Sequence, residues 1–379
     1  MVDISRGGAP IERALSEPSS LTIVIPTRNR PQLCGALVGF LRRQGVKHRI
    51  IVADASDEPE RAALHAACGG ASEILTFPPE IDIVDKFNAA IEAAKTLFVA
   101  LLPDDDIPLP HAIDRCLDHL VRHPEVTAAQ GYILDFAIRR WFFDILRVRW
   151  FTPSIEHQDP LQRLYHLVRR YQPFFWAVFR KEALSIAMRR ARAPGIVCLQ
   201  EMTFMTTLVL LGEFARLPCV YMLRGVEESL SPLAQTHPFF ALLADSEAFF
   251  THFGTYRDDL AAFIQATIEP SLGPADLRHM LNLIHTICFL PEMEGGPMEH
   301  TVQALFDPSM RWTVAPPAPP EFRKVGWYDS TVRSARRGRR YVWRREVLHA
   351  EPADEILITP DERARVTRAL EDYEIAILG

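Results

Sequence analysis

The sequence predicts an α/β fold, in which a mostly parallel sheet carries helices on both faces, followed by a helical C-terminal extension. Short apolar runs alternate with helix-like segments from residue 21 onward, an order typical of a parallel sheet covered on both faces. Each run ends in proline or polar residues, as a strand does where it meets a loop. Beyond about residue 225 the alternation stops, and the remaining apolar segments have helical spacing.

The first part of this fold has four predicted strands and four predicted helices. The strands are the runs LTIVIP, HRIIVADAS, SEILTF and TLFVALLP. The helices are expected over residues 31–44, 58–67, 83–95 and 109–122. Pro110 stands near the start of the last helix, where a missing backbone N–H costs little.

The pattern is less regular after residue 106. Residues 137–151 alternate as in a half-exposed strand, FFWAVFRKEAL predicts a strand that leads into a helix, and FARLPCVYMLRG predicts two short extended pieces. Further helices are expected over residues 201–211, 238–266 and 274–291, the first of which ends at Gly212. A proline-rich stretch at 307–319 cannot form a regular helix, and a basic run and an acidic helix follow it.

The chain length of 379 residues exceeds one average domain. We expect four segments. They are an N-terminal segment (1–20), an α/β domain (21–225, in two halves, 21–106 and 107–225), a helical region (226–306) and a C-terminal part (307–379) with linker, basic segment and helix.

Composition and charge exclude several classes of protein. The net charge of −6 gives no general reason to expect nucleic acid as a partner. No apolar stretch approaches the ~20 residues needed to cross a bilayer, and the N-terminus lacks the apolar core of a signal peptide. The six cysteines are scattered without a CxxC pair, which disfavours a thiolate zinc site and fits a reducing compartment. We therefore expect a cytoplasmic protein.

The polar ends of three predicted strands are the candidate site. They are the stretches Thr27–Arg30, Asp54–Asp57 and Asp104–Asp106. The carboxyl ends of parallel strands meet at one edge of the sheet, where ligands bind in this class of fold. Three adjacent aspartates repel one another, so a positive partner is expected beside them.

In an extended segment Asp104 and Asp106 would face one ligand while Asp105 faces elsewhere. Two such carboxylates suit a divalent cation, Mn²⁺ or Mg²⁺, that also contacts substrate phosphates. The alternative is that the aspartates only supply negative charge ahead of the following helix, where the helix dipole stabilises it.

The ordered motifs resemble the family 2 glycosyltransferases with the GT-A fold, a Rossmann-like arrangement. They are IPTRNRP, a glutamine that closes the first helix (Gln44), IIVADAS, and FNAAIEAAKTLFVALLPDDD. The resemblance covers roughly residues 21–224. It implies that residues 21–106 form a nucleotide-binding half and residues 107–225 an acceptor-binding half.

The resemblance also implies roles for individual residues. Thr27 and Asp54 match the positions that contact the base and ribose, Asn88 matches the asparagine of the helix before the acidic motif, and Asp104 and Asp106 match the DxD pair that holds metal and diphosphate. Either Asp104 or Asp105 would take the ribose-side role, because Pro103 stands at the family's first acid. Arg30 and Lys86 complete the expected donor-binding set. Lys86 would replace the basic residue that the family often places where Phe87 stands.

A general base is expected on the acceptor side. CLQEMTFMTTLVLLG resembles the family's helix that begins with Glu-Asp, which places Glu201 at the base position. Such a carboxylate would accept the proton of the attacking hydroxyl, and a single direct displacement would invert the anomeric carbon. The alternative is that Glu201 is an ordinary solvated helical residue. The other candidate carboxylates are Asp135, Asp159, Glu227 and Glu228.

These inferences predict a metal-dependent, inverting glycosyltransferase. Its donor would be a nucleotide sugar, with UDP preferred through the resemblance, and its acceptor a hydroxyl on a sugar, a lipid-linked molecule or a protein. The alternatives are a catalytically silent sugar-nucleotide-binding or scaffolding protein and a nucleotidyltransferase, although no glycine-rich phosphate loop follows LTIVIP. The basic run Arg336–Arg345 would either pair with the acidic tail or contact an anionic acceptor or the inner membrane surface.

Overall fold

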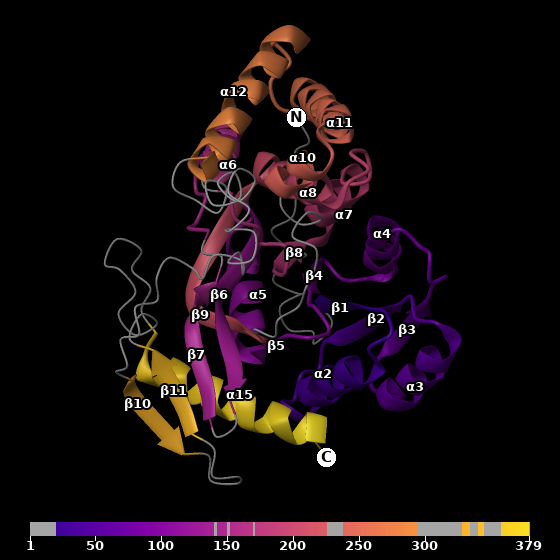
Figure 1. Ribbon diagram of the computed structural model, residues 1–379, viewed down its shortest axis with the longest axis vertical. Helices are drawn as coiled ribbons and strands as arrows, with labels where there is room; N and C mark the ends of the chain where they lie inside the picture. Colours follow the sequence, from indigo (N-terminus) through magenta and orange to yellow (C-terminus); the bar gives the residue numbers. More distant parts are fainter. Residues whose placement is uncertain are drawn as a thin grey trace, which may run out of the picture.

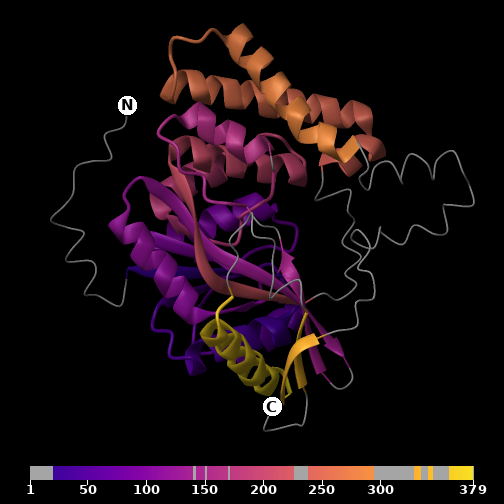
Figure 2. The same cartoon turned by 90° about the vertical axis from the view of Figure 1, so that its left-hand side faces the viewer.

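The computed structural model describes residues 20–139, 142–149, 152–169, 171–225, 238–293, 328–333, 340–344 and 358–378. Figure 1 shows a central sheet with helices packed around it and a helical layer at one end of the molecule. Figure 2 shows the same layers from the side.

The sheet of the described residues has eleven strands, in the order β10-β11-β7-β6-β8-β4-β1-β2-β3, with β9 paired to β6 and β5. The strands are β1 (Leu21–Thr27), β2 (Arg49–Asp54), β3 (Glu73–Thr76), β4 (Phe98–Leu101), β5 (Ile107–Pro108), β6 (Val126–Arg139), β7 (Phe142–Arg149), β8 (Val178–Arg180), β9 (Glu213–Gly225), β10 (Tyr328–Arg333) and β11 (Arg340–Arg344). The pairs β1–β2, β1–β4 and β2–β3 are parallel, as the alternating pattern predicts. From β4 outward the sheet is mixed, because β8 runs antiparallel to β4 and β6.

The helices that follow the strands confirm the predicted α/β order. They are α2 (Pro31–Arg43), α3 (Glu58–Cys68), α4 (Ile83–Ala93), α5 (Pro110–Arg122), α6 (Pro160–Arg169), α7 (Lys181–Arg190), α8 (Val197–Leu211), α10 (Pro238–Ala244), α11 (Ser246–Thr267), α12 (Pro274–Met293) and α15 (Pro360–Leu378). The segment expected as one helix over 238–266 is two helices. They divide at Asp245, whose carboxylate caps α11 by accepting a hydrogen bond from the Ala248 N–H.

Alternate residues of the central strands face two separate cores. Ile23 and Ile25 of β1 pack with α2, α5 and α15, whereas Val24 packs with α4, α7 and α8. A third core joins α6 and α8 to α11 and α12. The sheet therefore has helices on both faces, and the helical region extends one of these faces.

Strand β6 was not predicted, because its residues VTAAQGYILDFAIR show no alternation of apolar and polar side chains. It lies between β7, β8 and β9, and strands buried on both faces lack that alternation. Gly131 lets β9 approach closely, since a Cβ there would stand 2.3 Å from the Cys219 carbonyl oxygen. The segment FARLPCVYMLRG, expected as two extended pieces, lies in a single strand, β9, which pairs with β6.

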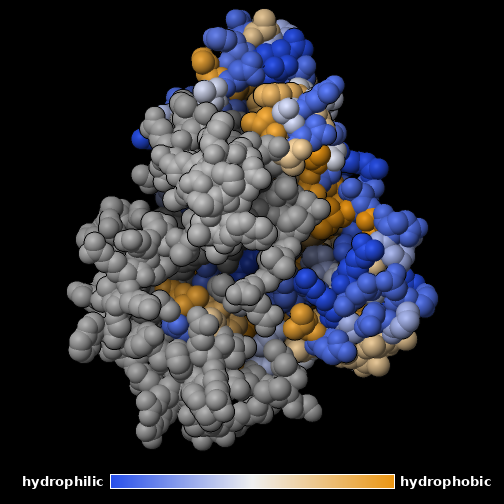
Figure 3. Space-filling view, viewed as in Figure 1, coloured by the Kyte–Doolittle hydropathy of each residue, from blue (hydrophilic) through white to orange (hydrophobic). Residues whose placement is uncertain are grey.

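The C-terminal part returns to the main body of the protein. Strand β11 pairs in parallel with β7. Helix α15 packs against α2, so two segments more than 300 residues apart in sequence lie side by side (Figures 1 and 2). The linker 307–319 and half of the basic run 336–345, namely 336–339 and 345, lie outside the described residues. None of the helices in the described ranges has the length and apolar character that crossing a membrane requires. In Figure 3, the surface over α3 and α4 is mainly hydrophilic.

Candidate functional site

The polar strand ends gather at one edge of the sheet. Thr27 at the end of β1 is the register partner of Asp54 at the end of β2. The Thr27 hydroxyl donates to Asp104 Oδ2 at 2.7 Å, which connects the first strand end to the acidic segment after β4. Burial raises the pKa of Asp104, and the hydrogen bond from Thr27 opposes this rise. The parallel order of the strands thus assembles the three stretches that the sequence singles out.

The three aspartates lie on a turn between β4 and β5, which corrects the expected extended conformation. Because the chain turns here, the alternation of an extended strand does not apply. Arg30 Nη1 lies 3.1 Å from Asp104 Oδ1 and 2.9 Å from Asp105 Oδ2, so two adjacent carboxylates share one guanidinium. Arg30 is thus a positive partner of the acidic cluster. Its side chain is half-exposed.

Asp106 has a different cationic neighbour, Arg224 on β9. Strands β5 and β9 pair antiparallel, with Ile107 opposite Leu223, so the preceding and following residues of the two strands also meet. Arg224 Nη1 lies 3.9 Å from Asp106 Oδ2, and the Asp106 side chain is buried. Sequence analysis missed Arg224. The only signal was an arginine at the polar end of FARLPCVYMLRG, and nothing local shows which strand it joins.

Lys86 and Asn88 on α4 point in different directions. Lys86 is buried, and its Nζ donates to the Thr27 carbonyl oxygen at 3.1 Å. Burial lowers the pKa of Lys86, and the negative charges of Asp104 and Asp54 oppose this effect. Asn88 instead donates from Nδ2 to the Met188 carbonyl oxygen of α7 at 3.4 Å. Residues two apart on a helix do not face the same side, so only Lys86 reaches the strand ends.

Asp54 is fully buried at the end of β2. Its Oδ1 accepts a hydrogen bond from the Ser56 N–H at 2.8 Å, and its Oδ2 lies 3.7 Å from Arg61 Nε. The Ser56 hydroxyl in turn accepts from the N–H of Asn29, whose φ of 56° is in the left-handed region that asparagine tolerates. Asp54 thus fixes the turn that follows β2 and holds it against the turn that follows β1.

Glu201 lies in the second turn of α8, which begins at Val197, four residues earlier than expected. Tyr171 Oη donates to Glu201 Oε1 at 3.3 Å. Burial raises the pKa of Glu201 to about 7, and the Tyr171 hydrogen bond and the positive charge of Arg224 lower it in part. Arg224 therefore acts electrostatically on both Asp106 and Glu201.

The alternative carboxylates have other surroundings. Asp135 is buried within β6, and Asp159 Oδ1 accepts the Leu161 N–H at the start of α6. Glu227 and Glu228 lie outside the described residues.

The donor chemistry of the aspartate turn fits a hard divalent cation. Carboxylate oxygens are the ligands that Mg²⁺ prefers, and this ion is usually bound by one or two carboxylates together with substrate phosphates and water. Within the described residues, no group of three or more His, Cys, Asp or Glu side chains converges as a ready-made metal site. An ion at Asp104 and Asp106 would therefore need further ligands, such as phosphate oxygens and water.

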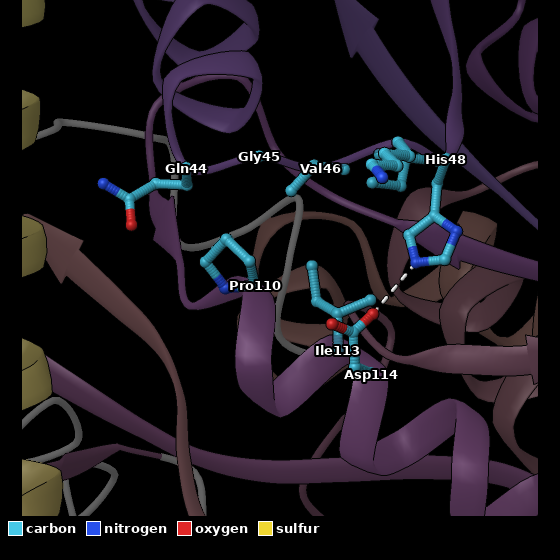
Figure 4. Close-up of a pocket in the computed structure, with 9 residues that line it drawn as sticks. Gln44, Gly45, Val46, His48, Pro110, Ile113 and Asp114 are labelled. Atoms are coloured by element: carbon cyan, nitrogen blue, oxygen red, sulfur yellow. Dashed lines mark hydrogen bonds and ion pairs between the residues drawn. The ribbon is translucent and has the colours of Figure 1, made fainter. Parts of the chain in front are cut away.

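A separate cavity of about 270 Å³ lies at the opposite edge of the strands. Its lining includes Gln44 and Gly45 after α2, His48 before β2, and Pro110 of α5, and His48 Nε2 lies 2.9 Å from Asp114 Oδ1 (Figure 4). None of the predicted site residues lines this cavity.

Comparisons with known proteins support the motif-based resemblance. Residues 22–185 match the family model of glycosyl transferase family 2. No curated protein matches the sequence. The structure of S. aureus TarS 1–349 in complex with UDP-GlcNAc has a TM-score of 0.51 at 13% identity, covering 76% of this chain and 77% of that chain.

Two further structures show lower similarity. The mannosyltransferase PcManGT from Pyrobaculum calidifontis, in complex with GDP-Man and Mn²⁺, has a TM-score of 0.40 at 15% identity, covering 81% of this chain and 89% of that chain. Glucosyl-3-phosphoglycerate synthase from Mycobacterium tuberculosis, in complex with Mn²⁺, UDP and phosphoglyceric acid, has a TM-score of 0.38 at 13% identity, covering 67% and 80%. The family match and the TarS fold confirm the resemblance that the motifs indicated: residues 22–185 match glycosyl transferase family 2, and the chain has a GT-A fold.

Proposed function

We propose that this protein is a metal-dependent, inverting glycosyltransferase that moves a sugar from a nucleotide donor, with UDP preferred, to a hydroxyl acceptor. The observation that carries the proposal is the charged edge of the sheet within the family 2 domain. There Arg30 and Arg224 lie beside the aspartate turn, and the positive charge of Arg224 also acts on Glu201. This combination suits a substrate that carries a diphosphate at one end and a reacting sugar at the other.

On the donor side, each group has a distinct role in the proposal. Thr27 and the turn fixed by Asp54 hold the base and ribose. Asp104 and Asp106 hold Mn²⁺ or Mg²⁺, which supplies Lewis-acid stabilisation of the charge that develops on the departing diphosphate. Arg30 is already bonded to Asp104 and has a half-exposed side chain, so it can turn to the same phosphates. Lys86 supports the site by donating a hydrogen bond from Nζ to the Thr27 carbonyl oxygen.

On the acceptor side, Glu201 takes the proton of the attacking hydroxyl. A carboxylate with a pKa of about 7 is a stronger base than an ordinary glutamate, and near neutral pH a large fraction is still ionised. Tyr171 fixes the orientation of this carboxylate through its hydrogen bond to Oε1. A single base and direct displacement give inversion at the anomeric carbon.

A thermal-shift panel tests the proposal. Nucleoside diphosphates and nucleotide sugars would be added with Mn²⁺, with Mg²⁺ or with a chelator. A ligand present at a hundredfold its Kd raises the free energy of unfolding by ~2.7 kcal/mol. We expect this stabilisation with UDP or a UDP-sugar and Mn²⁺, and little with the chelator. If no nucleotide stabilises the protein under any condition, the proposed function is wrong.

A further inference from the structure

A second cavity, of about 180 Å³, lies between α6 and the segment 152–155. It is lined by Thr152, Pro153, Ser154, Ile155, His166 and Arg169. Sites that enclose a whole small molecule usually have volumes of about 300–1,000 Å³. This cavity therefore suits one chemical group of a larger ligand.

The wall formed by residues 152–155 is held in place by β9. Arg216 donates from its backbone N–H to Ser154 Oγ at 2.9 Å and from Nε to the Thr152 carbonyl oxygen at 2.8 Å. Ile155 and Phe214 exchange two backbone hydrogen bonds, of 2.8 and 3.2 Å. A hydroxyl that accepts a hydrogen bond keeps its own proton to donate. The wall thus has a fixed backbone and offers the Ser154 hydroxyl as a donor.

The other side chains give the cavity a positive character. His166 and Arg169 stand one turn apart at the end of α6, and none of the described lining residues is acidic. Arg216 adds a positive charge behind the wall, because burial lowers its pKa only to about 10 and it stays protonated at neutral pH. Guanidinium, imidazole and hydroxyl donors without a carboxylate are complementary to a phosphate group.

A short stretch of chain links the cavity to the proposed base, Glu201. Helix α6 packs against α8, which carries Glu201. Tyr171, whose Oη donates to Glu201 Oε1 at 3.3 Å, follows Arg169 by two residues, which span at most about 7 Å of backbone. The carbonyl oxygen of the next residue, Gln172, accepts a hydrogen bond from Thr152 Oγ1 at 2.6 Å. The chain that contacts Glu201 therefore also borders the cavity.

We propose that this cavity is a subsite that binds a phosphate group of the acceptor through Arg169, His166 and Ser154. The inference rests on the proposed function and narrows the acceptor from any hydroxyl compound to one that carries a phosphate. The cavity holds only the phosphate, so the remainder of the acceptor lies outside it and brings the reacting hydroxyl to Glu201.

Substitutions at Arg169 and Ser154 test the subsite. Arg169→Gln removes the charge, Arg169→Lys keeps it, and Ser154→Ala removes the hydroxyl donor. Basic side chains in the last turn of a helix also stabilise the helix dipole, whether or not they bind a ligand. Arg189→Gln is therefore the matched control, since Arg189 stands in the last turn of α7, a helix of the same length, and does not line the cavity.

Calorimetry with EDTA present, so that no metal recruits phosphate to the aspartate turn, would compare two kinds of probe. The first is inorganic phosphate. The second is a set of phosphomonoesters, namely glucose-6-phosphate, ribose-5-phosphate and glycerol-3-phosphate, each with its neutral parent compound. UDP binding with Mn²⁺ and the Tm without ligands would be measured for the same full-length proteins.

We expect at least one phosphomonoester to bind more tightly than inorganic phosphate, and the neutral parents to bind far more weakly. Arg169→Gln should weaken binding of that ester by about tenfold, or about 1.4 kcal/mol. Ser154→Ala should also weaken it, whereas Arg169→Lys should retain most of the affinity and Arg189→Gln all of it. UDP binding with Mn²⁺ should be unchanged in every variant.

Three results overturn the inference: no binding of any phosphomonoester by the wild type, wild-type affinity in Arg169→Gln, or an equal loss in Arg189→Gln. If no ester binds more tightly than inorganic phosphate, the cavity holds a free anion and the assignment to the acceptor is wrong. If the wild type binds UDP with Mn²⁺ but no ester, this inference fails alone. If it binds an ester through Arg169 but no nucleotide, the proposed function fails and the phosphate site stands.

Discussion

Substitution of Glu201 by glutamine tests the proposed base. The change keeps the shape and the hydrogen bond to Tyr171 but removes the ability to accept a proton. We expect the transfer rate to fall about 10²–10⁴-fold, the usual contribution of general base catalysis, while UDP and Mn²⁺ bind as before. For the wild type, the rate should rise with pH and level off above the Glu201 pKa of about 7.

The same substitution has a measurable effect on stability. Burial raises the pKa of Glu201 from 4.5 to about 7, and at ~1.4 kcal/mol per pH unit the ionised form costs up to roughly 3 kcal/mol. Because the folded-state pKa is raised, the protonated Glu201 side chain favours the folded state fully below about pH 4.5. This contribution to the free energy of unfolding is lost as pH rises through about 7. Since Glu201 is half-buried, solvent screening makes this magnitude an upper limit.

Thermal unfolding across pH 4–8, together with transfer assays, would check both expectations, with the exposed Glu182→Gln of α7 as control. The wild type and the control should lose stability over this range relative to Glu201→Gln. Near-wild-type transfer by Glu201→Gln would refute its role as base. Parallel stability curves for all three proteins would refute the raised pKa.

Three other substitutions test the rest of the site. Asp106→Asn should weaken UDP binding in the presence of Mn²⁺ and nearly abolish transfer, because an amide cannot balance the cation; calorimetry that shows unchanged affinity would remove Asp106 from the metal site. Asp54→Ala should cost roughly 1.5–3 kcal/mol of UDP affinity and also lower the Tm, since Arg61 loses its buried partner; equal UDP binding by mutant and wild type would limit Asp54 to a structural role. Arg224→Gln should raise the pKa of Glu201 and move the acidic limb of the kcat/KM profile to higher pH, because a positive charge that lowers this pKa is removed. An unshifted profile would contradict the electrostatic effect of Arg224 on Glu201.

The α/β part of the fold could be predicted because its strands are short apolar runs with polar ends. The carboxyl ends of parallel strands lie at one edge, so the approach of Thr27 to Asp104 followed from strand order alone. Strand β6 could not be predicted, since burial on both faces removes the alternation that marks a strand.

The residues that sequence reasoning missed come from segments far apart along the chain. Arg224 reaches Asp106 only through the pairing of β5 with β9, and Tyr373 reaches Phe40 only through the docking of α15 on α2. Neither contact leaves a local pattern. The aspartate turn shows a second limit: the residues were identified, but side-chain directions assumed for a strand do not hold where the chain turns.

A crystal structure of the protein with UDP and Mn²⁺ tests the central claim most directly. The account predicts the uridine beside Thr27 and the turn after Asp54, with the metal between the diphosphate and the carboxylates of Asp104 and Asp106. Nucleotide bound in the cavity between His48 and Asp114, or at the aspartate turn without any metal, would contradict it.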